Sequence, residues 1–141
     1  MLCDCHASAT LAARDLARAR EFYENVLGFE VANEAEDGIL YHARGSAIFL
    51  YPSSFAGTNK ATAVSFETDD LPGLVSELKN RGVTFEEYDF PGLKTRDGIA
   101  TMEDGSTAAW FTDTEGNILS ITQPVRPIPW PRDEVTARQG A

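Results

Sequence analysis

An internal repeat limits the folds open to this chain more than any other feature of the sequence. Residues 9–31, ATLAARDLARAREFYENVLGFEV, align with residues 63–85, AVSFETDDLPGLVSELKNRGVTF. Each copy passes from a short apolar stretch through an Asp–Leu pair and a stretch with helical spacing of apolar residues to a glycine. The repeat predicts one structural unit that occurs twice, each copy containing a strand followed by a helix.

The ends of both predicted helices carry capping residues. Asp15 and Asp70 are placed as N-caps, where a carboxylate accepts hydrogen bonds from free backbone N–H groups and meets the positive end of the helix dipole. Gly28 and Gly82 are placed as the left-handed residues that end the helices. These signals predict helices between residues 15 and 28 and between residues 70 and 82.

Strand-like segments bounded by glycine follow each helix. They are residues 29–33, 38–44 and 46–53 in the first half, and residues 83–90, 98–103, 107–113 and 117–123 in the second. The pattern predicts an α+β fold with two tandem βαβββ modules, at about 6–52 and 61–123, joined by a linker at 53–60. Together they are expected to form a curved mixed sheet with its helices outside and a groove inside, as a single domain over residues 1–123.

The C-terminal residues 124–141 are predicted to be a Pro-rich tail. Pro124, Pro127, Pro129 and Pro131 prevent a regular helix or sheet, and Trp130 is the one large apolar anchor. Three roles stay open for this tail: packing on its own domain, packing on a second subunit, or none. The loop at residues 88–98 is long enough to act as a lid over the groove or as an ordinary surface loop.

The acidic balance of the chain narrows the choice of partners. Twelve basic against 22 acidic residues give a net charge of −10, which repels nucleic acid and anionic membranes and suits a neutral or cationic small molecule. No signal peptide or long apolar run is present, so we expect a cytoplasmic protein. Cys3 and Cys5 are too close together in the sequence to form a disulfide that would stabilise the fold, and they are expected to be reduced thiols.

Three segments resemble the vicinal oxygen chelate (VOC) superfamily, which includes glyoxalases, bleomycin resistance proteins and extradiol dioxygenases. They are residues 14–29 (RDLARAREFYENVLGF), 66–83 (FETDDLPGLVSELKNRGV) and 109–121 (AWFTDTEGNILSI). The likeness covers about residues 10–123, although Thr114 and Glu115 replace the more usual Pro and Asp. It implies the VOC fold and, because members often complete their grooves at a subunit interface, a homodimer.

The resemblance also implies where metal ligands would stand. Metal-using members carry His, Gln or Glu at positions that correspond here to Ser8, Ala63, Ser120 and one of residues 48–51. None of these is a strong donor, so we expect no metal site and no cofactor, which places the chain in a branch without metal ligands. A shifted metal site that uses His6 and Glu67 is the alternative.

The groove is expected to bind a ligand through aromatic rings and small residues. Phe49 with Tyr51, and Trp110 with Phe111, form two pairs of rings; alternation is expected to send one ring of each pair inward, and the choice between them stays open. The predicted ligand-binding residues are Ser8, Thr10, Phe49, Tyr51, Ala63, Ser65, Glu67, Trp110 and Ser120. No catalytic residue is predicted.

Three functions are compatible with these features. The first is a metal-free protein, similar to bleomycin resistance proteins, that binds or sequesters an aromatic or cationic compound and so serves antibiotic resistance. The second is an enzyme of the glyoxalase or dioxygenase kind, a lyase, isomerase or dioxygenase with a non-standard site. The third is a protein-interaction module that uses the tail and the sheet edges. The first function is preferred, and binding without catalysis is favoured over an enzymatic role.

Overall fold

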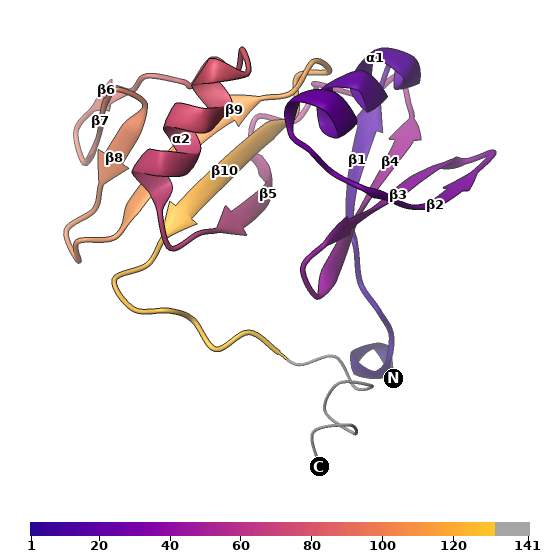
Figure 1. The fold of residues 1–141 in the computed structure, drawn as a ribbon, viewed down its shortest axis with the longest axis horizontal. Helices are drawn as coiled ribbons and strands as arrows, with labels where there is room; N and C mark the ends of the chain where they lie inside the picture. Colours follow the sequence, from indigo (N-terminus) through magenta and orange to yellow (C-terminus); the bar gives the residue numbers. More distant parts are fainter. Residues whose placement is uncertain (132–141) are drawn as a thin grey trace.

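A computed structural model describes residues 1–131 and shows two mixed β-sheets side by side (Figure 1). The first sheet has the strand order β1-β4-β3-β2. Its strands are β1 (Ala9–Ala13), β2 (Val31–Ala35), β3 (Gly38–Ala43) and β4 (Ser46–Pro52). β1 runs parallel to β4, and the other neighbours are antiparallel.

The second sheet repeats this plan and extends it. Its order is β5-β10-β9-β8-β7-β6, again with the first strand parallel to the last. The strands are β5 (Thr62–Glu67), β6 (Asp89–Phe90), β7 (Leu93–Arg96), β8 (Ile99–Thr101), β9 (Thr107–Thr112) and β10 (Ile118–Gln123). The predicted α+β fold is therefore confirmed, with the expected curved sheet divided into two sheets.

Each sheet carries one helical segment between its first and second strands. The first is α1 (Leu16–Glu21), continued by a π-helical turn, η2 (Phe22–Val26); the second is α2 (Leu71–Asn80). Asp15 accepts a hydrogen bond from the Arg18 N–H, and Asp70 accepts one from the Gly73 N–H, so both predicted N-caps are confirmed. Gly28 (φ 82°) and Gly82 (φ 97°) follow the helices in the left-handed region, also as predicted.

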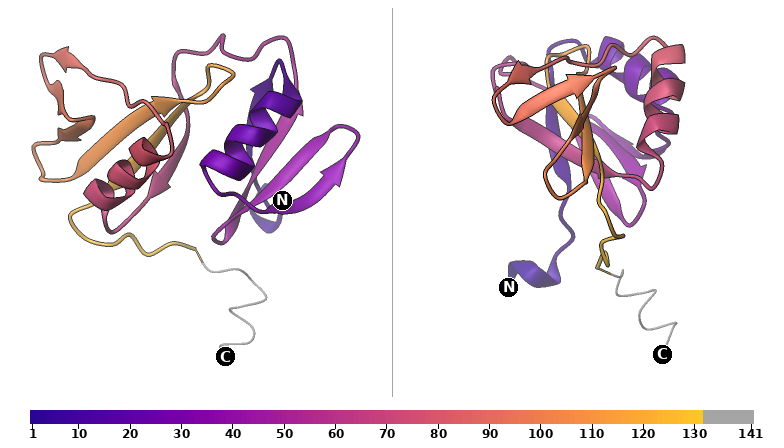
Figure 2. Two further views of the ribbon diagram at one scale, coloured as in Figure 1. Left: turned by 45° about the horizontal axis from the view of Figure 1, so that its top comes forward. Right: turned by 90° about the vertical axis from the view of Figure 1, so that its left-hand side faces the viewer.

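Both helices lie on the same side of the sheets (Figures 1 and 2). The core lies between the helices and the sheets. This core continues from one module to the other through aromatic contacts. The ring centroids of Phe29 and Phe66 are 5.7 Å apart, and those of Phe22 and Phe111 are 6.5 Å apart. The opposite face of each sheet is left without a helix.

Two details of the second module differ from the prediction. The expected strand at residues 83–90 is wrong: Phe85 makes a single bridge to Phe111, and only Asp89–Phe90 form a strand. Residues 88–98, predicted as a loop, form the antiparallel β6–β7 hairpin and the turn that leads into β8. The hairpin forms because Gly92, with a φ of 84°, supplies the positive φ of its tight turn.

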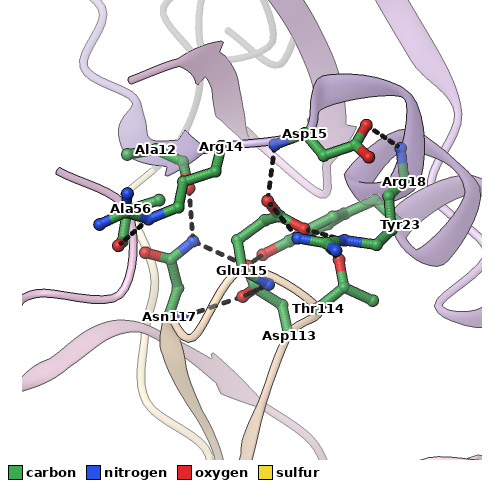
Figure 3. Close-up of polar contacts among 10 residues, drawn as sticks. All are labelled: Ala12, Arg14, Asp15, Arg18, Tyr23, Ala56, Asp113, Thr114, Glu115 and Asn117. Carbon is green, nitrogen blue, oxygen red and sulfur yellow. Dashed lines mark hydrogen bonds and ion pairs between the residues drawn. The ribbon is translucent and has the colours of Figure 1, made fainter. Parts of the chain in front are cut away.

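The turn between β9 and β10 fastens the second module to the first (Figure 3). Asp113, only 6% exposed, accepts hydrogen bonds from the Tyr23 hydroxyl (2.7 Å), from the backbone N–H groups of Glu115 and Asn117, and from the Asn117 side chain. The Asn117 side chain also donates to the carbonyl of Ala12 in β1. One carboxylate thus organises the turn and binds it to the first module.

Glu115 makes the second set of contacts across this junction. Its fully buried carboxylate pairs with the Arg18 guanidinium (2.9 Å) and accepts hydrogen bonds from the Asp15 N–H and the Thr114 hydroxyl. Burial alone would raise the pKa of Glu115, but these three donors outweigh it and lower the pKa to about 2. Glu115 therefore supplies an ion pair between the modules.

The linker packs tightly against the same turn, and this predicts a large effect of a small substitution. Gly57 has a φ of 73°, and an added Cβ would lie 2.7 Å from the carbonyl oxygen of Glu115. Gly45 has the same φ with nothing within 4 Å. We expect Gly45→Ala to lower the free energy of unfolding by about 1 kcal/mol and Gly57→Ala by about 2–3 kcal/mol. Urea unfolding of both variants tests this; equal losses would show that the linker and the turn are not in close contact.

The ends of the described chain lie outside the sheets. Residues Leu2–Asp4 form a 3-10 turn, η1, and residues 124–131 contain no helix or strand. The remaining residues of the predicted tail, 132–141, lie outside the described residues. Over residues 1–131, no helix combines the length and the apolar character needed to cross a membrane.

Candidate functional site

The face of the first sheet that carries no helix is a candidate binding surface. In β1 and β4, Leu11 and Leu50 are buried in the core on the helix side. Their neighbours Thr10 and Phe49 point to the opposite side, because successive side chains of a strand alternate. We call this side of each sheet its free face.

The free face of the second sheet is defined by the same alternation. Phe111 and Leu119 are buried in the core, so Trp110 and Ser120 lie on the free face. These two residues are direct partners across β9 and β10, and Ser120 is also paired with Ser65 in β5. Trp110 and the two serines are therefore neighbours on this face, where Ser65 is exposed, Trp110 is half-buried and Ser120 is buried.

The strand register locates the fourth position at which the family places a metal ligand. Thr10 and Ser65 each lie five residues before the capping aspartate of their repeat, so they are equivalent. Thr10 pairs with Phe49, and Ser65 pairs with Ser120. Phe49 is thus the first-module counterpart of Ser120, a position that the sequence narrowed only to residues 48–51.

The side chains at the four positions do not fit a divalent metal ion. Ser8 and Ser120 offer neutral hydroxyls, Ala63 offers a methyl group, and Phe49 offers a phenyl ring. The Ser120 hydroxyl is already hydrogen-bonded to that of Ser65 at 2.5 Å. Among residues 1–131, no group of three or more His, Cys, Asp or Glu side chains could hold a metal ion.

The aromatic side chains of β4 lie together on the first free face. Phe49 and Tyr51 are half-buried, with ring centroids 6.2 Å apart and planes within 5° of parallel. The expectation that one ring of this pair turns toward the helices is wrong, because residues two apart on a strand share a face. Thr10 stands beside Phe49 on β1 and is exposed.

Trp110 belongs to a second aromatic cluster, on the free face of the second sheet. For the pair Trp110 and Phe111 the expected split is confirmed, with Phe111 in the core. The rings of Tyr88 and Trp110 form a T-shaped pair with centroids 5.6 Å apart, and the ring centroids of Phe90 and Tyr88 are 5.9 Å apart. Burial, and then the charge of Glu86, raise the pKa of Tyr88, so its hydroxyl stays neutral at physiological pH.

The carboxylate of Glu67 lies near the end of β5, on the same face as Ser65. It is half-buried, and its Oε2 accepts a hydrogen bond from the indole N–H of Trp130 in the C-terminal segment. Its Oε1 has no accessible surface and accepts no hydrogen bond from residues 1–131. Of the three roles open for the tail, the described part adopts the first: it contacts its own domain.

A pocket of about 350 Å³ lies where the two modules meet. Ser8, directly before β1, and Ser65, in β5, line it, with Ala47 and Phe66 among the other lining residues. Two of the predicted binding residues are thus brought together. Ala63, at an irregularity in the β5–β10 pairing, is exposed.

The N-terminal residues do not build a site in this structure. Cys3 and Cys5 are free and exposed, and His6 is exposed in the segment before β1. Glu67, which the alternative metal site would need, already accepts a hydrogen bond from Trp130. The contacts of Tyr88 with Trp110 and of Trp130 with Glu67 were not predicted from the sequence. The one sign of them in the sequence is an isolated aromatic residue in a segment rich in turn residues or prolines.

Comparison with known structures shows the same fold in several proteins. A bleomycin-binding protein in complex with bleomycin matches with a TM-score of 0.65 and 20% identity, over 85% of this chain and 98% of the other. A glyoxalase/bleomycin resistance protein/dioxygenase from Alicyclobacillus acidocaldarius matches with a TM-score of 0.65 and 20% identity, over 87% and 93%. A lactoylglutathione lyase from Agrobacterium tumefaciens matches with a TM-score of 0.61 and 18% identity, over 84% and 92%.

At the level of sequence, no curated protein matches the chain. The model of one family does match it, over residues 6–121, which includes all but the last two residues of the two modules. The resemblance inferred from the three sequence segments is thereby confirmed. The chain belongs to the Glyoxalase/Bleomycin resistance protein/Dioxygenase superfamily.

Proposed function

We propose that this protein binds and sequesters a planar aromatic or cationic small molecule on the free faces of its sheets, without a metal ion. The observation that carries the proposal is the position of Trp110, whose ring lies beside the Ser65–Ser120 hydroxyl pair where metal-using relatives carry a ligand. An aromatic platform beside small polar groups suits stacking of a flat organic molecule.

The chemistry of the two free faces supports this choice. The rings of Tyr88 and Trp110 pack in an edge-to-face arrangement, which supports a defined orientation of the indole. The parallel rings of Phe49 and Tyr51 offer a similar apolar surface on the first sheet. We propose Ser8, Thr10, Phe49, Tyr51, Ala63, Ser65, Glu67, Trp110 and Ser120 as the ligand-binding residues.

Electrostatics favours a cationic ligand over an anionic one. The net charge of −10 attracts cations at long range and repels phosphates. The complex of a bleomycin-binding protein of this fold with bleomycin supports a role in small-molecule binding. We therefore propose a drug-sequestering role in the cytoplasm, of the kind that would serve antibiotic resistance.

The proposed active form is a homodimer. In the single chain, Thr10 and Ser65 stay exposed on the free faces, so a second copy has room to cover them. Sedimentation equilibrium should give about twice the 15.4 kDa mass of one chain. A monomer at micromolar concentration that still binds ligand would show that one chain is sufficient.

Isothermal titration calorimetry with ethidium, a planar cation, and with metal-free bleomycin tests the proposed function. We expect saturable binding of at least one, and we expect Trp110→Ala to weaken it about 10-fold or more because a large stacking surface is lost. Phe55→Ala removes an aromatic side chain that is 76% exposed on the linker and is the matched control, with no expected effect. Unchanged binding in Trp110→Ala, or no binding of either compound to the wild type, would contradict the proposal.

A further inference from the structure

The contact between Trp130 and Glu67 resembles the contact of an aromatic ligand with a binding site. The indole of Trp130 is a planar aromatic ring with one N–H donor, and that donor is 2.5 Å from Oε2 of Glu67. Glu67 lies two residues after Ser65 on β5 and so shares the free face of Ser65 and Ser120. The chain itself thus places an aromatic N–H group against the proposed binding surface.

The carboxylate of Glu67 has capacity for a further donor. A carboxylate offers about four lone-pair positions, whereas residues 1–131 supply Glu67 with the single bond from Trp130. Oε1 is excluded from solvent and accepts nothing from these residues. A buried acceptor without a donor is unfavourable, so a ligand with two N–H groups, or with an amine, would satisfy this side chain better than the indole does.

Trp130 is held loosely enough to be displaced. Its side chain is 63% exposed, so little apolar surface would be uncovered by its departure. Residues 124–131 form no backbone–backbone hydrogen bond with the rest of the described chain, and their four prolines have no N–H to donate. The bond to Glu67 is thus the main polar contact that keeps Trp130 in place.

We propose that Glu67 recognises an N–H donor of a planar aromatic ligand, and that Trp130 occupies this position until the ligand displaces it. This inference rests on the proposed function and adds the chemical class of the ligand: a flat ring system with amine or ring N–H groups, preferably cationic. Trp130 acts as an internal competitor, so its removal strengthens ligand binding.

Two planar cations that share one ring system test this assignment by calorimetry. Ethidium carries two aromatic amines on a phenanthridinium ring, and 5-methylphenanthridinium carries none. We expect ethidium to bind the wild type about 10-fold more tightly, and we expect this preference to disappear in Glu67→Met, which keeps the length of the side chain but removes the acceptor. Glu86→Met, which changes a half-buried glutamate on the segment that leads to Tyr88, is the control and should keep the preference.

Trp130→Phe tests the competition. The substitution keeps an aromatic ring and removes the N–H, so ethidium affinity should rise about 3- to 10-fold in the wild-type background and stay unchanged in the Glu67→Met background. The indole N–H resonance of Trp130 should also shift on ethidium binding and in Glu67→Met. If Trp110→Ala weakens ethidium binding while the Glu67 and Trp130 variants do not change it, this inference is wrong and the proposed function stands. If no variant alters binding, both are wrong. If neither cation binds, this inference is wrong, and the proposed function is also wrong unless bleomycin binds.

Discussion

Replacement of Asp113 by alanine is expected to lower the free energy of unfolding by about 3–5 kcal/mol. Asp113 is buried and accepts four hydrogen bonds, from Tyr23, from the N–H of Glu115, and from the backbone and side chain of Asn117. Alanine would leave these donors without an acceptor in the interior, and the turn that joins the modules would lose its organising group. Urea unfolding followed by circular dichroism measures the effect, and the midpoint of thermal unfolding should fall by about 10–20 °C.

Two further variants distinguish the loss of these hydrogen bonds from a general effect of removing a negative charge. Asp37→Ala removes an exposed aspartate in the turn between β2 and β3 and should change the free energy of unfolding by less than about 0.5 kcal/mol. Tyr23→Phe removes one of the four donors and should cost about 1.5–3 kcal/mol. Losses of similar size in Asp113→Ala and Asp37→Ala would show that the junction does not depend on this carboxylate.

Glu115 is expected to make the stability of the protein depend on acid pH. Its pKa in the folded chain is about 2, below the ordinary value of 4.5, so the folded state binds a proton less readily than the unfolded state. The carboxylate therefore contributes about 3 kcal/mol above pH 4.5, and this contribution is lost as the pH falls from about 4.5 to 2. Unfolding free energies measured across this interval test the direction and the size.

Glu115→Gln isolates this contribution from that of other acidic groups. At pH 7 the variant should be less stable than the wild type by about 3 kcal/mol, and the difference should shrink steadily below pH 4.5. Glu103→Gln, at an exposed turn, is the matched control and should track the wild type at every pH. A constant difference between wild type and Glu115→Gln from pH 7 to pH 2 would contradict the low pKa of Glu115.

Those parts of the fold that depend on local chemistry could be predicted from the sequence. The capping aspartates Asp15 and Asp70 and the left-handed glycines Gly28 and Gly82 act within a few residues of their own position, and the structure places all four as expected. Because the two copies share these signals, the repeat also predicted two modules that each begin with a strand followed by a helix, as the structure shows. The parallel pairing of the first and last strands in each module was not predicted and is seen only in the structure.

The remaining features depend on contacts between residues distant in the sequence. Nothing near Asp113 shows that Tyr23, 90 residues away, donates to it. The β6–β7 hairpin appears as a loop in the sequence because its strands have only two and four residues, too few for a pattern of alternating apolar and polar residues to be recognised.

The geometry of the candidate site could not be predicted from the sequence. Which face a strand turns to the helices depends on its register, and the register is set by pairing with a partner strand. The pairs Thr10–Phe49 and Ser65–Ser120 fix this register in the structure. The contact of Trp130 with Glu67 spans 63 residues and has no local signal beyond an aromatic residue among prolines.

The most direct test of this account is a ligand titration combined with metal analysis. The untagged chain would be purified, its Zn, Ni, Mn and Fe content measured by plasma mass spectrometry, and ethidium binding compared before and after dialysis against EDTA. We predict less than about 0.1 metal ion per chain and the same dissociation constant in both samples. One tightly held ion per chain, together with loss of binding after chelation, would contradict the central claim that aromatic and small side chains bind the ligand without a metal.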